Sequence, residues 1–529
     1  MADKIDITVR EGVAYIGTIA DPEIAEKVVN GTSFKPVGIE YTTTYRRRRP
    51  AGFDGRIKLV RHSKCPLGLL PRVLNILHDA GAEVNLVQAD AEERQLPPIE
   101  TRLDEIQSRF YQDDAVAVTA VFDRGVIRAP TGSGKSAVAA RIIHLKKKRA
   151  VVIVPTIDLL HQTKSFLEEH LRILDGIEIR RYEDTPGTEG MYQKFEPIGQ
   201  LGDGVVDPRG VTVATIRTMA KIVDVAYESY EFAEADDKDD TKINPRELRE
   251  WVESLGVVIV DEAHMLGARV LFDVVNAIPA RDKYGMSASP WRDDGADLMI
   301  EAATGPVLYR IDTKILVEHG FLVPPIIRVI PTAKWWQPAA WGRVCKRCGR
   351  QALNYKPTCE CGSQEFKSQF QECYKQEIVE NEVRNTRIAE ETMKLDCATL
   401  MLVKQIKHGQ ALQELLPDSV FLSGKEKGDS RKDAFKKLRK GELQIVVATT
   451  IADLGLDVPA LQALVLAGGG KSSTRHLQRI GRVVRPYEGK SCGLVLDFDD
   501  SHVHTWFRKH EEARRAIEHA EWNDVAIWY

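Results

Sequence analysis

The amino-acid sequence predicts an α/β protein with two parallel-sheet domains in tandem, preceded by a small α+β domain and carrying a cysteine-rich insertion in the second. Three observations support this prediction: the length of 529 residues, a recurrent alternation of strand-like and helix-like segments, and a change of pattern at the N-terminal end. At about 100–200 residues per domain, the length suggests about three or four domains.

Short β-branched apolar runs separated by longer helical stretches are typical of buried parallel strands joined by crossover helices. Such runs occupy residues 150–154, 211–214, 257–260, 399–403, 444–448 and 463–466. Because they fall into two groups along the chain, we expect two parallel sheets.

The N-terminal segment is strand-like from Ile5 to Ile19 and helical from Leu69 to Asp79, so we expect a separate α+β domain that ends near Pro97-Pro98. Consecutive prolines favour an extended connector, and Val323-Pro324-Pro325 is our candidate joint between the two larger domains. The predicted division is an N-terminal domain at 1–98, a first parallel-sheet domain at 99–322 and a second at 323–529, with the insertion at about 335–372.

The net charge of −3 conceals strongly segregated charge. Between Tyr41 and Asn75, seven arginines and two lysines stand against one acid, whereas Glu228 to Asp240 holds seven acids and one lysine. The near-neutral total therefore does not exclude a polyanionic partner. The basic side chains that could bind the phosphates of such a partner are Arg46, Arg47, Arg48, Arg49, Arg56 and Lys58. A solvated loop without a partner is the alternative.

No apolar run approaches the roughly 18 residues of a membrane span, so we expect no membrane partner. Hydrophobic residues make up 43% and charged residues 29%, which is ordinary for a globular protein. The segment from Met1 to Asp6 lacks the features of a secretory signal. We therefore expect a cytoplasmic protein whose eight cysteines stay reduced.

A glycine-rich loop, A-P-T-G-S-G-K-S from Ala129 to Ser136, is the strongest local motif. Glycines allow backbone N–H groups to surround phosphates at a helix N-terminus. We assign ATP binding to this loop, with Lys135 at the β- and γ-phosphates and the Ser136 hydroxyl on Mg²⁺. The phosphate-binding set is Thr131, Gly132, Ser133, Gly134, Lys135 and Ser136. The strict pattern has glycine at the position of Ala129, and an ordinary glycine-rich turn is the alternative.

An acidic motif, Asp261-Glu262-Ala263-His264, ends the apolar run at 257–260. A carboxylate at a strand end can coordinate Mg²⁺, and an adjacent glutamate can orient the attacking water in phosphoryl transfer. We assign these two roles to Asp261 and Glu262. Together with the glycine-rich loop, the motif predicts a site that hydrolyses ATP.

In this combination the two motifs resemble those of superfamily 2 helicases, whose acidic motif can have the same D-E-A-H letters. The likeness continues in order along the chain. Thr156, in P-T-x-x-L-x-x-Q, and Thr215 look like contacts to the nucleic-acid backbone. Ser287-Ala288-Ser289 resembles the segment that, together with His264, couples hydrolysis to domain movement.

The resemblance extends into the second parallel-sheet domain. The segment from Thr449 to Pro459 is similar to the T-x-x-x-x-x-G-[IL]-D-x-P motif. This likeness implies a nucleic-acid contact at Thr449 and ATP contacts at Gly455 and Asp457.

Two further motifs complete the resemblance. Gln478 to Arg485 is similar to Q-x-x-G-R-x-x-R, which implies catalytic roles for Gln478 and for Arg482 and Arg485 at the γ-phosphate. Residues three apart share one helix face, and a solvated basic face is the alternative for this arginine pair. Arg109-Phe110-Tyr111-Gln112 resembles an adenine-recognition element, which implies that Gln112 binds the base.

The N-terminal domain carries G-F-D-G-R-I-K-L from Gly52 to Leu59, followed by Leu67-Gly68-Leu69-Leu70. These segments resemble a pattern of phage UvsW-type helicases, which have a small α/β domain ahead of an XPB-like motor. The resemblance spans most of the chain and implies two tandem RecA-like domains that use ATP and Mg²⁺. It further implies a DNA helicase, a monomer on DNA, that unwinds or remodels forks, junctions and R-loops in replication, recombination or repair in a bacterial or phage-infected cell.

Two other interpretations stay open: the translocase subunit of a restriction or defence assembly, and an RNA helicase, because the implied contacts are largely to the backbone. The polar residues after the strand-like run at 493–496 are expected to form a sheet end rather than a nuclease metal site. They are Asp497, Asp499, Asp500, His502 and His504. The lack of a nuclease constellation and the basic N-terminal domain favour an autonomous motor.

Four cysteines, Cys345, Cys348, Cys359 and Cys361, form two knuckles and predict a structural zinc-ribbon-like Zn²⁺ site. The second pair is C-x-C rather than C-x-x-C, and reduced thiols in a flexible insertion are the alternative. A four-thiolate site has no open position, so it would serve folding rather than catalysis. Nearby aromatic and basic residues predict either nucleic-acid contact or packing on the motor: Trp335, Trp336, Trp341, Arg343, Lys346, Arg347 and Arg350.

Overall fold

The computed structural model divides into two compact units, Met1–Ile311 and Asp312–Tyr529. The residues that it describes are all except 1–3, 11, 37–38, 40–44, 46–53, 89–95, 105, 182–188, 226–243, 264–267, 289–295, 342, 353–357, 424–427, 450–457, 471–472, 523–526 and 529. Among the described residues, no helix is long and apolar enough to cross a membrane. The domain boundaries predicted from the sequence stay predictions.

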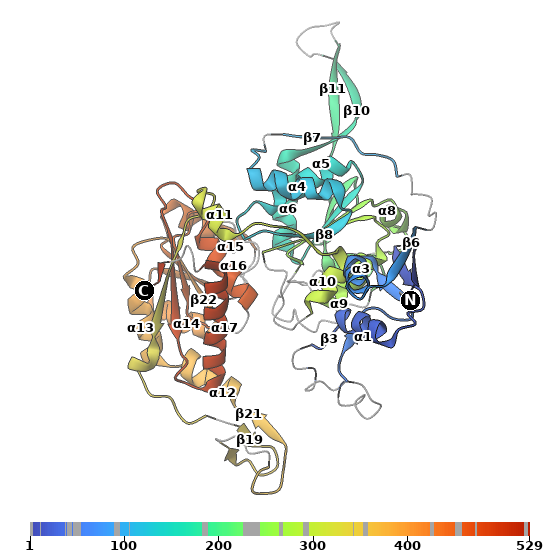
Figure 1. Ribbon diagram of the computed structural model, residues 1–529. Coiled ribbons are helices and arrows are strands. Elements are labelled where there is room, and N and C mark those ends of the chain that lie inside the picture. Colours follow the sequence, from blue (N-terminus) through green and yellow to red (C-terminus); the bar gives the residue numbers. More distant parts are fainter. Residues whose placement is uncertain are drawn as a thin grey trace. The chain divides into compact units, whose positions relative to one another are not determined.

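A four-stranded sheet with two helices forms the N-terminal part of the first unit (Figure 1). The strand order is β5-β2-β1-β6, with β1 parallel to β6 and antiparallel to β2. The elements are β1 (Lys4–Arg10), β2 (Val13–Ile16), α1 (Pro22–Gly31), β3 (Ser33–Phe34), β4 (Ile57–Lys58), β5 (Lys64–Pro66), η3 (Leu67–Leu69), α3 (Leu70–Asp79) and β6 (Glu83–Gln88). This is the predicted α+β arrangement, and a turn at Gly12 (φ +76°) divides the predicted strand region into β1 and β2.

An eight-stranded sheet forms the larger part of the first unit, in the order β13-β12-β14-β9-β15-β16-β8-β17. All neighbouring strands are parallel except the edge pair β12 and β13. The strands are β8 (Arg124–Arg128), β9 (Ala150–Val154), β12 (Gly199–Gly202), β13 (Val205–Asp207), β14 (Val211–Thr215), β15 (Val257–Asp261), β16 (Asp282–Ser287) and β17 (Val307–Arg310). The helices are α4 (Phe110–Val121), α5 (Lys135–Lys146), α6 (Ile157–His170), α7 (Ile216–Ile222), α8 (Arg249–Glu253), α9 (Ala268–Ala277) and α10 (Asp297–Thr304).

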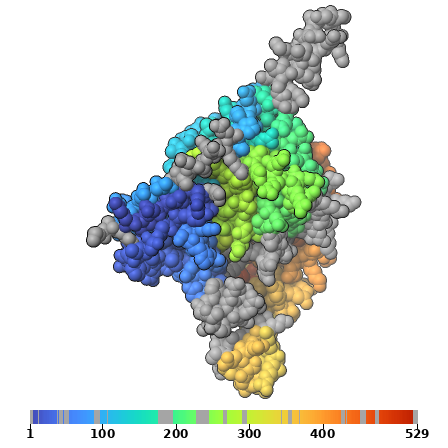
Figure 2. Space-filling view, turned by 90° about the vertical axis from the view of Figure 1, so that its right-hand side faces the viewer, coloured from blue at the N-terminus to red at the C-terminus, as the bar shows by residue number. Residues whose placement is uncertain are grey.

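The N-terminal part packs against α9 and α10 of the same unit. Phe272 of α9, and Leu298 and Ala302 of α10, contact the hydrophobic core of the N-terminal sheet. In Figure 2 the blue N-terminal residues lie against the yellow-green surface to which these helices belong. The N-terminal part therefore shares a packed interface with the larger sheet domain.

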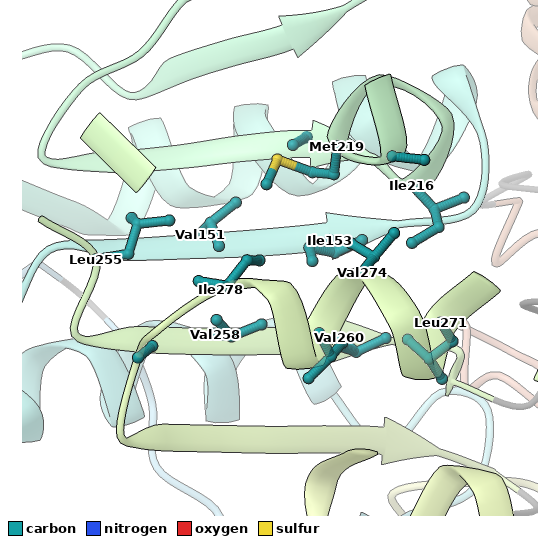
Figure 3. Packing of buried hydrophobic residues seen from close by; sticks show 14 of the residues in the cluster. Val151, Ile153, Ile216, Met219, Leu255, Val258, Val260, Leu271, Val274 and Ile278 are labelled. Atoms are coloured by element: carbon teal, nitrogen blue, oxygen red, sulfur yellow. The ribbon is translucent and has the colours of Figure 1, made fainter. Parts of the chain in front are cut away.

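Helices cover both faces of the large sheet, which explains why its strands are apolar without alternation. Val151 and Ile153 of β9 lie in one core cluster, whereas Ala150, Val152 and Val154 of the same strand lie in another. Successive strand residues point to opposite faces, so both faces are buried. Figure 3 shows the first cluster, in which residues of β9 and β15 contact residues of α7 and α9.

A three-stranded antiparallel sheet, in the order β11-β10-β7, completes the first unit. Its strands are β7 (Thr101–Leu103), β10 (Leu171–Arg181) and β11 (Glu189–Glu196). The strand periodicity of the sequence did not predict this sheet.

The second unit has a seven-stranded sheet in the order β23-β24-β22-β25-β26-β18-β27, with every neighbouring pair parallel. The strands are β18 (Pro325–Pro331), β22 (Thr399–Val403), β23 (Ser419–Leu422), β24 (Ile445–Thr449), β25 (Ala463–Leu466), β26 (Gly493–Asp499) and β27 (Ile527–Trp528). The helices are α11 (Thr313–Glu318), α12 (Phe370–Tyr374), the π-helical turn η6 (Lys375–Val379), α13 (Glu382–Met393), α14 (Ile406–Leu415), α15 (Gly428–Lys440), α16 (Ser473–Val483) and α17 (Thr505–Trp522). The two sheets confirm the predicted architecture of two tandem parallel-sheet domains.

One of the two prolines in the predicted extended joint belongs to the second sheet. Pro325 is the first residue of β18, and the Val323 N–H donates to the Val484 carbonyl at 2.8 Å. Proline is tolerated at the first residue of a strand, where no ladder hydrogen bond is lost. Val323 and Pro324 therefore lead directly into β18, and the joint between the two domains stays a prediction.

The insertion has its own small antiparallel sheet, in the order β20-β19-β21. Its strands are β19 (Arg343–Cys345), β20 (Gln351–Ala352) and β21 (Phe366–Ser368). It lies between β18 and α12 along the chain, within the predicted span, and it carries the four clustered cysteines.

Candidate functional site

The predicted ATP-binding motifs meet at the carboxyl ends of three adjacent strands, β15, β16 and β8. The parallel register pairs Asp261 with Met286, and Ser287 with Arg128. The glycine-rich loop leaves β8 and enters α5. Ligands of parallel α/β sheets bind beyond the carboxyl ends of the strands, so the motifs lie where this architecture places a nucleotide.

The backbone of the loop has the conformation that phosphate binding requires. Gly132 and Gly134 have φ angles of +89° and +82°, in the left-handed region that glycine adopts without strain. Gly134 caps the N-terminus of α5, where N–H groups and the helix dipole favour an anion. The hydroxyl oxygens of Thr131 and Ser133 are buried and have no hydrogen-bond partner among the described residues. Buried polar atoms of this kind are expected where a ligand supplies the partner.

Lys135 and the acidic pair form a compact charged cluster. The Lys135 Nζ lies 3.0 Å from the Glu262 Oε1, and both side chains are nearly buried. The Glu262 N–H donates to the Asp261 Oδ1 at 2.9 Å. Burial, followed by the neighbouring Glu262 carboxylate, raises the pKa of Asp261 to about 6. Two carboxylates and one lysine beside a phosphate-binding loop are the donor set expected for ATP with Mg²⁺.

The side chains of Tyr111 and Gln112 hold the loop from α4. The Tyr111 hydroxyl donates to the Ser133 carbonyl at 2.7 Å, and the Gln112 Nε2 donates to the same oxygen at 2.9 Å. Arg109 donates in turn to the Tyr111 hydroxyl at 2.9 Å. The sequence pointed to Gln112 through the R-F-Y-Q pattern but gave no role to Tyr111. Binding of adenine by Gln112 stays a prediction.

Of the threonines predicted to contact nucleic acid, Thr215 and Thr449 end strands, and Thr156 lies just beyond the end of β9. Thr156 caps α6, where its Oγ1 accepts from the Leu159 N–H, and Thr215 caps α7 by accepting from the Thr218 N–H. Thr449 is the last residue of β24, and its buried Oγ1 has no hydrogen-bond partner among the described residues. The coupling residue Ser287 is fully buried at the end of β16, and its carbonyl accepts from the Ala129 N–H. Nucleic-acid contact and coupling at these positions stay predictions.

Two of the three predicted catalytic residues of the second unit lie on α16. Gln478 is buried there and Arg482 is half-buried, whereas α16 ends at Val483 and Arg485 lies beyond it. The shared helix face predicted for Arg482 and Arg485 is therefore wrong. Pro486 explains this end, because a proline disfavours helical conformation at the residue before it. The γ-phosphate role of both arginines stays a prediction.

Several predicted site residues lie outside the described part of the chain: Arg46, Arg47, Arg48, Arg49, His264, Ser289, Gly455 and Asp457. Of the remaining basic candidates, Arg56 donates to the Ser33 Oγ at 3.2 Å and is half-buried. Lys58 is exposed. A phosphate contact by either stays a prediction.

The structure brings the four predicted zinc ligands together. The sulfur atoms of Cys345, Cys348, Cys359 and Cys361 lie within 4.8 Å of one another. The Cys345–Cys361 and Cys348–Cys359 sulfur pairs are each 3.6 Å apart. Sulfurs about 2.3 Å from a tetrahedral Zn²⁺ would be separated by about 3.8 Å, so the arrangement fits the ion. The Cys348 N–H lowers the pKa of Cys345 to about 6, whereas the pKa of Cys348 is raised to about 11, so Cys345 is the favoured thiolate of these two.

The aromatic residues beside the cysteines anchor the insertion to the second unit. The Trp336 and Trp341 indole N–H groups donate to the Glu377 carboxylate of η6, at 3.0 and 2.8 Å, and the Ala339 N–H also donates to it. Trp335 packs against Phe498 of β26. Of the two interpretations that the sequence left open, packing on the motor accounts for these three tryptophans.

A second cluster of possible metal ligands in the second unit is a buried ion network. Its members His476, Asp497 and Glu518 lie on α16, β26 and α17. The Arg514 Nε donates to the Asp497 Oδ2 at 2.9 Å, and Arg515 pairs with both Asp497 and Glu518. These two guanidinium groups supply positive charge that offsets the buried carboxylates, and a purely structural role for the polar strand end stays a prediction.

Comparison with known proteins identifies the two sheet domains. Residues 100–292 match the family described as "Type III restriction enzyme, res subunit", and residues 383–487 match "Helicase conserved C-terminal domain".

Similar proteins include one named as a helicase from the Sulfolobus islandicus filamentous virus, 27% identical over 76% of this chain and 66% of its own length. The DNA 3'-5' translocase XPB2 of Sulfurisphaera tokodaii is 24% identical over 72% of this chain and 79% of its own length. The ATP-dependent DNA helicase uvsW of Enterobacteria phage T4 is 22% identical over 89% of this chain and 85% of its own length. With both helicase domains in order and the ATP-site motifs at one sheet edge, the chain belongs to the superfamily 2 helicases, which are nucleic-acid-dependent ATPases.

Proposed function

We propose that the protein is an ATP-dependent DNA translocase that unwinds or remodels branched DNA, such as forks, junctions and R-loops, in replication, recombination or repair. The carrying observation is the likeness to the phage T4 helicase uvsW over 499 residues, 89% of this chain. A match of that length extends beyond the residues of the two family models, 100–292 and 383–487. The proposal includes a duplex-binding role for the N-terminal part.

The geometry of the ATP site supports the roles that we assign to Lys135, Asp261 and Glu262. Lys135 would bind the β- and γ-phosphates, and Asp261 with Ser136 would hold Mg²⁺, which neutralises phosphate charge when bound. Lys135 pairs with Glu262 in this structure, so an arriving phosphate would compete for the lysine. Release from Lys135 would leave the Glu262 carboxylate available to orient the attacking water.

A substrate series with the purified chain tests the proposal. We expect ATP hydrolysis to be stimulated by DNA, and forked and four-way DNA to be unwound or regressed without any partner protein. Single-stranded DNA, plain duplex and RNA of equal length serve as comparisons, with a salt titration because phosphate contacts weaken as salt rises. Stimulation by RNA alone would contradict the DNA assignment, and hydrolysis without strand movement would contradict the autonomous motor.

One observation favours a second candidate, the translocase subunit of a restriction or defence assembly. The first family match carries the description of a restriction-enzyme subunit. Under this alternative, the chain alone would hydrolyse ATP on DNA, and remodelling would appear only after a partner is added. The substrate series therefore separates the two candidates.

We also propose that Cys345, Cys348, Cys359 and Cys361 hold one structural Zn²⁺. The expected result is about one zinc per purified chain and nearly none in the variant Cys345→Ser/Cys348→Ser, measured by atomic emission. The matched control is Cys397→Ser/Cys492→Ser, which removes two half-buried thiols outside the cluster. Zinc-free wild-type protein, or unchanged zinc in the first variant, would show that the thiols do not form the site.

A further inference from the structure

The Leu67-Gly68-Leu69-Leu70 segment, singled out in the sequence without a chemical role, lies at the contact between the N-terminal part and α10. Gly68 is buried in η3 with its backbone directly against α10. A Cβ atom at this position would lie 2.1 Å from the Glu301 carbonyl oxygen and 2.7 Å from that of Ala302. Since those atoms are backbone, no side chain can move aside, and glycine is needed for this approach.

An ion pair between Arg72 and Glu301 lies next to this close approach, with Arg72 four residues after Gly68. The Arg72 Nε donates to the Glu301 Oε1 at 2.9 Å, and its Nη2 donates to the Oε2 at 2.5 Å. Two parallel hydrogen bonds fix the direction of approach as well as the distance. The Glu301 side chain is 18% exposed and the Arg72 side chain 43%, so solvent reaches the pair from the arginine side.

Apolar contacts extend the same interface on both sides. Leu59 contacts the cluster formed by Ala296 and Met299, and Phe34 does the same from β3. Ala302 is fully buried within the N-terminal core itself. The N-terminal part is thus held by apolar packing, by backbone contact at Gly68 and by an oriented ion pair.

The helices beneath this interface also support the catalytic strands. Leu271 and Val274 of α9, and Ile300 and Ala303 of α10, lie in one core cluster with Val258 and Val260 of β15. β15 ends in Asp261, and α9 follows the acidic motif along the chain. One layer of helices therefore contacts the N-terminal part and the strand that carries the acidic pair.

We propose that Gly68, Arg72 and Glu301 form a positioning latch. The latch holds the N-terminal part in one fixed position on α10, so that DNA bound to the N-terminal part stimulates ATP hydrolysis. Arg72 and Glu301 are positioning residues in this scheme and contact neither nucleotide nor phosphate. The inference rests on the proposed DNA-remodelling function and assigns it an intramolecular coupling contact.

The test compares Arg72→Glu, Glu301→Arg and the double variant in the full-length chain. We expect basal ATPase without DNA to stay within about twofold of wild type, whereas stimulation by forked DNA falls at least about fivefold in each single variant; coupling energies of this kind are typically 5–150-fold. The double variant restores the pair with reversed polarity and should recover most of the stimulation. Lys27→Glu makes the same charge change at an exposed position of α1 and is the matched control.

Two outcomes would overturn the latch: single variants that keep full stimulation, or a double variant that is no better than the singles. Gly68→Ala provides a second route, since its Cβ must push the two parts apart, and it should also lose stimulation while basal turnover remains. If wild-type protein itself shows no response to forked DNA, the proposed function fails instead, so the two failures are distinguishable.

Discussion

The variant Lys135→Ala is expected to lose nucleic-acid-stimulated ATP hydrolysis by about 10²–10³-fold or more, the range seen when a preorganised contact to transition-state charge is removed. Lys135 is the first residue of α5 and lies 3.0 Å from Glu262 at the edge where the phosphate loop and the acidic strand meet. Steady-state phosphate release with saturating DNA is the measurement.

The matched control for this variant is Lys27→Ala, which removes an exposed lysine of α1 and should leave turnover unchanged. Lys135→Arg keeps the charge but not the compact ammonium, and should recover only a small part of the activity. Both variants should show wild-type circular dichroism. Retained turnover in Lys135→Ala would contradict the assignment of the glycine-rich loop to ATP.

The variant Asp261→Asn should lose hydrolysis by a similar factor while it stabilises the protein at neutral pH. Burial and Glu262 raise the pKa of Asp261 to about 6, above the usual value for an aspartate. In the folded state the carboxyl group therefore keeps its proton at pH values where the unfolded chain has lost it. The resulting stabilisation is complete below about pH 4 and is lost as pH rises through 6.

At pH 7 the buried Asp261 carboxylate is ionised in the wild-type protein, which lowers the free energy of unfolding. Asparagine carries no charge and avoids this loss. We expect Asp261→Asn to raise the free energy of unfolding by about 1–3 kcal/mol at pH 7 and by almost nothing at pH 4. Nucleotide-free protein unfolded by denaturant at the two pH values measures this difference. The exposed Asp79→Asn is the control, and an equal effect at both pH values would refute the burial argument.

The fold was predictable where the cause of structure is local. The runs at 150–154, 257–260 and 399–403 are apolar on both faces because helices cover both faces, and the structure has strands at these residues. The glycine-rich loop was predictable because Gly132 and Gly134 meet a backbone requirement that few other residues meet. The four cysteines were found from spacing alone, and their sulfur atoms do converge.

Contacts between distant segments were not predictable from the sequence. Arg72 and Glu301 are 229 positions apart, and nothing in either local pattern indicates the other. Residues 171–181 and 189–196 pair as β10 and β11 although charged and polar residues interrupt their apolar pattern, so the rule of alternation fails there. Glu377 resembled any helical glutamate in the sequence, yet it accepts from both Trp336 and Trp341. Such roles depend on tertiary partners, which periodicity does not encode.

The attachment of the insertion has a consequence for how this protein could evolve. The hydrogen bonds to the Glu377 carboxylate come from Trp336, Ala339 and Trp341, which all precede the first of the four clustered cysteines along the chain. Because the Glu377 carboxylate anchors the start of the insertion, the part of the insertion after Trp341 could change in length or sequence without disturbing the order of the seven strands. The zinc-ribbon-like insertion could therefore be exchanged during evolution, for example to suit a new substrate, while the parallel-sheet domain that carries it is kept.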